Sequence, residues 1–118
     1  MASHSLLLRE SSAQAELDAD LQIVRGASAD PDGGIPHGAV LRRFAAALVN
    51  GRGELASARA ELCQAIGPER AAHAAGVVAS FDGINRVADA TGIRLDASSE
   101  QRAGDLIEDL GLAALRNA

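Results

Sequence analysis

The stretch GPERAAHAAGVVASFDGINRVADATG, residues 67–92, decides the fold class of this chain. Its only proline is Pro68, directly after the first glycine, and a proline fits well in the first turn of a helix. Apolar residues recur at helical spacing, and one side of the helix would carry Ala71, Ala75, Val78, Phe81, Ile84 and Ala88. We therefore predict a long helix from Pro68 to about Thr91 that buries this side and ends at Gly92.

The same periodicity predicts helices on both sides of this stretch. Residues 54–66 place Leu55, Ala58, Leu62 and Ile66 on one face, and residues 36–50 carry a broad apolar stripe. Leu17, Leu21 and Val24 share a face in residues 6–25. Ser98 with Gln101 resembles a capping box at the start of a last helix. We therefore expect an all-α fold, a single-domain bundle of about five helices.

The length of the chain sets the domain organisation. Its 118 residues suffice for one domain with one core and are too few for two ordinary domains. We expect a single helical domain over residues 1–118, with flexible segments at 1–5 and 26–35. Residues 26–35 are the first part of the loop GASADPDGGIPHG, residues 26–38, which shows no periodicity.

Charge and composition exclude several partners. The net charge is −5 and the only aromatic residues are two Phe, so the chain lacks the basic surface and the stacking side chains of a nucleic-acid binder. Its first ten residues, MASHSLLLRE, hold three consecutive Leu, too few for a signal peptide or a membrane span. The single Cys63 cannot form an intrachain disulfide. We expect a cytoplasmic protein with no nucleic-acid partner and no membrane association.

A polar cluster interrupts the apolar pattern of the long helix. Asn85, Arg86 and Asp89 lie within five positions, and Arg86 can pair on a helix with Asp82, four residues earlier, or with Asp89, three later. One interpretation is a structural lock that pins the helix end and the following tail. A ligand-binding site and a subunit contact are the alternatives.

The run VVASFDGINRVADATGIRLD, residues 77–96, resembles the C-terminal signature helix of the alkylhydroperoxidase AhpD-like, carboxymuconolactone decarboxylase-like superfamily, in its peroxidase-related branch. The matching positions are Phe81, Asn85, Arg86, Ala88, Asp89, Ala90, Gly92 and Leu95. A weaker likeness extends back to residue 36, so the resemblance covers about residues 36–96. It implies an AhpD-like helical fold and an oligomeric assembly.

The chain departs from that family where its redox chemistry resides. Redox members carry Cys-x-x-Cys followed by His, with a glutamate upstream as a proton relay. One thiolate attacks the peroxide and the other resolves the oxidised sulfur. This chain has one Cys and no such pair, and Asp82 stands where many relatives have Asn. We therefore expect no disulfide-based peroxidase activity and no cofactor.

The remaining chemistry-bearing residues give weak catalytic candidates. Cys63 and His73 lie on two helices that we expect to form a hairpin about Gly67, so the side chains could approach each other. A lone cysteine among small residues is, however, more often a small buried hydrophobe. Asp30, Asp32 and Gly33 resemble the start of a calcium loop, but the twelfth position from Asp30 is not glutamate. Neither His37 nor His4 has a ligand-like partner at i+4, so we expect no metal site.

Two function classes remain open. The first is a non-redox AhpD-like module that acts through oligomerisation or through a partner protein, as a homo-oligomer or as a hetero-oligomer with a related protein. The alternative is a cofactor-free enzyme, of the decarboxylase, isomerase or cyclase type, or a small-molecule binder with a pocket between helices. The resemblance includes a decarboxylase branch without a redox cysteine pair, so whether the chain is an enzyme stays open.

Overall fold

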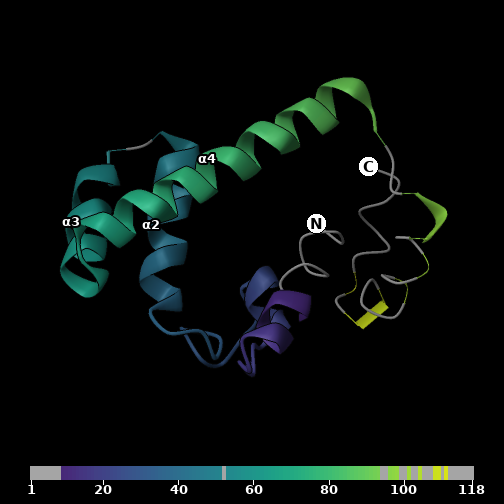
Figure 1. Cartoon of the computed structure of the whole chain (residues 1–118), viewed down its shortest axis with the longest axis horizontal. Coiled ribbons are helices and arrows are strands. Elements are labelled where there is room, and N and C mark those ends of the chain that lie inside the picture. Colours follow the sequence, from purple (N-terminus) through teal and green to yellow (C-terminus); the bar gives the residue numbers. More distant parts are fainter. Residues whose placement is uncertain are drawn as a thin grey trace. The chain divides into compact units, whose positions relative to one another are not determined.

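The computed structural model describes residues 9–51, 53–93, 96–98, 101, 104, 108–109 and 111. All regular structure in this part of the chain is helical (Figure 1). It contains the 3-10 helix η1 (Leu21–Arg25) and the α-helices α2 (Gly38–Asn50), α3 (Leu55–Ile66) and α4 (Pro68–Thr91). The all-α prediction is confirmed, with four helices whose bounds the described part defines, against about five predicted. The predicted last helix, from Ser98 onward, lies largely outside the described residues.

The chain divides into two compact units, one of Met1–Ile35 with Arg94–Ala118 and one of Pro36–Ile93. The second unit holds α2, α3 and α4, and the first holds η1. Within the described residues, no helix combines the length and the apolar character that crossing a membrane requires. The single domain that the sequence predicts over residues 1–118 stays a prediction.

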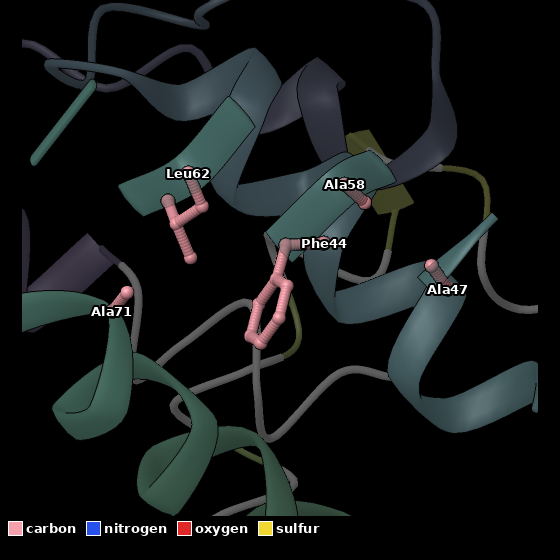
Figure 2. Packing of buried hydrophobic residues seen from close by; sticks show 5 residues of the cluster. All are labelled: Phe44, Ala47, Ala58, Leu62 and Ala71. Atoms are coloured by element: carbon pink, nitrogen blue, oxygen red, sulfur yellow. The ribbon is translucent and has the colours of Figure 1, made fainter. Parts of the chain in front are cut away.

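In the unit of residues 36–93, three helices pack against one another around a small apolar core. Its buried side chains come from all three helices and are Phe44, Ala47, Ala58, Leu62 and Ala71 (Figure 2). Leu62 is fully buried and Phe44 is 4% exposed. Because the other three are alanines, the helix axes can approach closely where they meet.

Helix α4 is much longer than the two helices on which it packs. It has 24 residues, against 13 in α2 and 12 in α3, so it spans about 36 Å where the others span roughly 20 Å. Its residues that pack in or against the core are Ala71, Ala74 and Ala75, all in its N-terminal third. The C-terminal half of α4 therefore runs beyond α2 and α3 (Figure 1).

Gly67 is the whole connection between α3 and α4. Its N–H donates to the carbonyl oxygen of Cys63 at 2.9 Å, and its own carbonyl accepts from the N–H of Ala71 at 3.0 Å. Its dihedrals, φ 87° and ψ 157°, lie in a region that only glycine adopts readily. The predicted turn at Gly67 and the predicted span Pro68–Thr91 are both confirmed.

The starts of α2 and α3 differ slightly from the predicted ones. α2 begins at Gly38 rather than Pro36, since His37 is its N-cap with a left-handed φ of 60°. α3 begins at Leu55, with Glu54 as N-cap. Both helices end where the sequence places their ends, before Gly51 and Gly67.

In the unit that holds η1, the helix predicted over residues 6–25 is wrong as a single element. Residues 9–14 are helical, Glu16 has a φ of 55°, and residues 17–20 have no regular structure before η1 begins. The Asp20 side chain accepts the N–H of Gln22 at 2.9 Å and so caps η1. Aspartate competes in this way with the helical backbone, which explains why the periodicity of Leu17, Leu21 and Val24 does not give one helix.

The loop that follows η1 is organised by one carboxylate. Asp30 accepts the N–H of Asp32 at 3.0 Å and that of Gly34 at 2.8 Å, and its own N–H bonds the hydroxyl of Ser28. The loop also meets the segment before η1, because the carbonyl of Gly33 accepts the N–H of Asp20 at 2.9 Å. A Cβ on Gly34 would lie 2.1 Å from the carbonyl oxygen of Asp18, so only glycine fits there.

Candidate functional site

The predicted polar cluster lies on the C-terminal half of α4, and its three side chains are exposed. Arg86 donates from Nε to Oδ2 of Asp82 at 2.8 Å, and this ion pair raises the pKa of Arg86. Within residues 53–93, no ion pair joins Arg86 to Asp89. The side chain of Arg86 is 68% exposed and that of Asp82 is 31% exposed. A pair this open to water is weakly stabilising.

The end of α4 is closed by groups other than Arg86. The hydroxyl of Thr91 donates to the carbonyl of Val87 at 2.7 Å, and Gly92 takes a left-handed conformation with its N–H on the carbonyl of Ala88. The N–H of Ile93 bonds the same carbonyl at 3.2 Å. Backbone and threonine contacts therefore terminate the helix, and a lock formed by Asn85, Arg86 and Asp89 stays a prediction.

The two weak catalytic candidates are not brought together. Cys63 is a free, partly buried cysteine on α3 that packs against the core. His73 is exposed on α4, where its neighbours Ala71 and Ala75 both face the core. A residue two positions from each lies about 200° around the helix from them. His73 therefore faces away from the layer that contains Cys63.

One aspartate of the loop, Asp30, uses its carboxylate to bind backbone N–H groups. The N–H groups of Gly34 and, second, of Asp32 lower the pKa of Asp30, because they stabilise its ionised form. Among the described residues, no group of three or more His, Cys, Asp or Glu is placed to hold a metal ion. The carboxylate of Asp30 is therefore a turn-forming group.

The exposed apolar face of α4 is the most unusual surface in the described part of the chain. Val77 is 57% exposed, Phe81 40% and Ile84 63%, and the neighbouring Val87 is 59% exposed. The prediction that Phe81 and Ile84 lie on a buried side is wrong, because α2 and α3 cover only the N-terminal part of α4. Large apolar side chains gathered on one surface mark binding sites more often than scattered ones do.

Three of these exposed residues form a continuous row with a partly buried alanine at each end. We call this row the α4 stripe: Ala74, Val77, Phe81, Ile84 and Ala88. Their spacings alternate as three, four, three and four residues, which is the pattern of the narrow seam in helix–helix pairs. The sequence contains this signal, but Val77 was not among the residues predicted for the apolar side. The sequence prediction therefore did not identify this row as a face distinct from the core-facing side of α4.

The α4 stripe carries no charge along its length. Its residues centre on one side of the helix, whereas Asp82 and Arg86 lie about 120° and 160° around the axis from that centre. The charges of α4 at this level are therefore on the far side and are paired with each other. Arg70, one turn before Ala74, is the charged residue in line with the row.

Comparisons with known proteins identify no relative: no family model matches the chain, and no curated protein and no solved structure matches it.

Proposed function

We propose that this chain is a non-redox helical module that acts by binding protein, either further copies of itself or a partner, through the α4 stripe. The single observation that carries the proposal is the exposure of Val77, Phe81 and Ile84 in one uncharged row. Fully burying an exposed side chain of this kind stabilises by roughly 1.5–3 kcal/mol. Val77, Phe81 and Ile84 are partly exposed, so each gains a fraction of that, and a partner that covers the row is favoured.

The sequence supports the non-redox part of the proposal. A disulfide mechanism needs a second thiol to resolve the oxidised one, and Cys63 is the only cysteine in the chain. Cys63 also packs against the core as a small apolar residue would. Membership of the AhpD-like superfamily and a cytoplasmic location stay predictions.

The alternative, a cofactor-free enzyme or small-molecule binder with a pocket between helices, has no specific observation in its favour. The side chains of Phe44, Leu62 and Ala71 meet where α2, α3 and α4 pack together (Figure 2). His73 and Asp89 are exposed and lie outside that region. The geometry supports the interaction module better.

Photo-crosslinking in living cells tests the proposal. A photoreactive amino acid replaces Ile84 on the α4 stripe in one variant and Ala79 on the opposite side of α4 in the other. Both positions are exposed, so neither change disturbs the core. We expect a defined protein adduct from position 84 that is absent from position 79 and is lost when Val77→Glu is added. Equal adduct patterns from the two positions would contradict the proposal.

A further inference from the structure

We infer that the occupant of the α4 stripe is the α4 stripe of a second copy of this chain, with the two helices antiparallel. This inference rests on the proposed function, since it names the partner for the same surface. Three properties of the stripe carry it: its spacing, the sizes of its side chains along the helix, and its position relative to α2 and α3.

The spacing indicates that the partner is a helix. A row that alternates between three and four residues fits a facing helix, whereas a broad stripe fits a flatter surface. The row extends over Ala74 to Ala88, four turns of α4. Between Val77 and Ala88 its flanks carry Val78, Ser80, Asn85 and Val87, none of which has a charge that would repel an identical helix.

The order of side-chain sizes is self-complementary when the helices are antiparallel. With Phe81 opposite Ile84 of the second copy, the two-fold axis passes between residues 82 and 83, and Ile84 meets Phe81 in return. The same register places Val77 opposite Ala88, a large residue against a small one. The largest side chains then meet at the centre of a closed, symmetric interface.

The position of the stripe disfavours the parallel arrangement. α2 and α3 pack against the N-terminal third of α4, so parallel helices would bring both copies of these helices to the same end (Figure 1). Parallel pairing would also place Arg70 beside Arg70 of the second copy. Antiparallel pairing places the two copies of α2 and α3 at opposite ends and keeps the two Arg70 side chains apart. It also aligns the helix dipoles favourably.

The size of the interface sets the expected strength. The exposed side chains of the stripe and its flanks bury on the order of 1,000 Å² in total when two copies pair, which places the dimer among weak, reversible complexes. We therefore expect a dissociation constant in the micromolar range.

Disulfide trapping between two single-cysteine variants tests the pairing and its direction. Cys63→Ala first removes the native thiol, and circular dichroism melts confirm that the chain still folds. Val77→Cys and Ala88→Cys are then made separately in this background, so that every disulfide must join two chains. The purified full-length variants are oxidised alone and as an equimolar mixture.

We expect the mixture to form at least tenfold more covalent dimer than either variant alone, and all of it to join position 77 to position 88. Efficient linking of Val77→Cys to itself would overturn the antiparallel arrangement. Absence of linking in every sample would overturn self-pairing. If the in-cell adduct at position 84 then contains a different protein, the proposed function stands without this inference. If that adduct is also missing, both fail.

Discussion

Arg86 donates from its Nε to Oδ2 of Asp82, one helical turn earlier on α4, over 2.8 Å. The sequence predicts that Arg86 pairs with Asp82 or Asp89 and in this way links the helix to the chain that follows it. The observed pair lies within a single helix, with Arg86 exposed and Asp82 partly exposed. Its contribution to the fold is therefore that of a surface ion pair, which salt screens.

Arg86→Ala should accordingly lower the melting temperature by no more than about 3 °C at low salt, because an exposed pair contributes little. In about 1 M salt the variant and the unchanged chain should melt together. Arg59→Ala, at an exposed position of α3, is the matched control. A large loss that persists in high salt would instead support the lock.

Gly67→Ala should destabilise the unit of residues 36–93 by about 1–3 kcal/mol, because φ 87° with ψ 157° strains any residue with a Cβ. The open space around Gly67 excludes a steric clash as the cause. Gly83→Ala, inside α4 and equally uncrowded, should stabilise by up to about 1 kcal/mol. Urea unfolding of both variants measures the two shifts, and shifts of the same sign would contradict this account of the turn.

Asp30 should titrate below its ordinary pKa of 3.8 in the folded chain. Because the pKa of Asp30 is lower in the folded than in the unfolded chain, its ionisation stabilises the fold at pH values above the unfolded-state pKa. This contribution disappears as the pH falls through the folded-state pKa. Carboxyl NMR titration of the full chain and of a peptide of residues 26–38 measures the difference. Equal values in the two samples would show that the bonds from Gly34 and Asp32 do not persist in solution.

The purified chain should not consume peroxide with a dithiol reductant in a way that depends on Cys63. Cys63 is partly buried against the core, which restricts access of peroxide and reductant to its sulfur, and no second cysteine exists to resolve an oxidised Cys63 within one chain. Cys63→Ser should therefore leave the peroxide consumption rate at the background of the reductant alone. A clear rate that this variant abolishes would refute the non-redox assignment.

The sequence predicts some parts of the fold well, because the deciding signals are local. Gly67, Pro68 and Gly92 bound α4 through dihedral preferences that do not depend on distant residues. Residues 6–25 do not form the single helix that was predicted, and the cause is again a local interaction. Periodicity is a weaker signal there than the bond between the Asp20 side chain and the N–H of Gln22.

The candidate site was predictable only in part, because periodicity identifies the apolar side of a helix and not what covers it. Phe81 and Ile84 have the spacing of buried residues, yet α2 and α3 are too short to reach them. The predicted lengths of the three helices already indicate that α2 and α3 cover only part of α4. The polar residues Asn85, Arg86 and Asp89 lie in the same half of α4, and they indicate a candidate site because they interrupt the apolar pattern.

The most direct test of the α4 stripe as a contact between copies is sedimentation equilibrium of the full chain from about 1 to 100 µM. We predict that the average mass rises with concentration from the one-chain value of 12.0 kDa towards that of two chains. Ile84→Glu should hold the mass at one chain throughout, because it places a charge in the seam. Ala79→Glu, which adds the same charge on the opposite side of α4, should behave as the unchanged chain. A constant one-chain mass for the unchanged chain, or association of Ile84→Glu as strong as that of Ala79→Glu, would contradict the account.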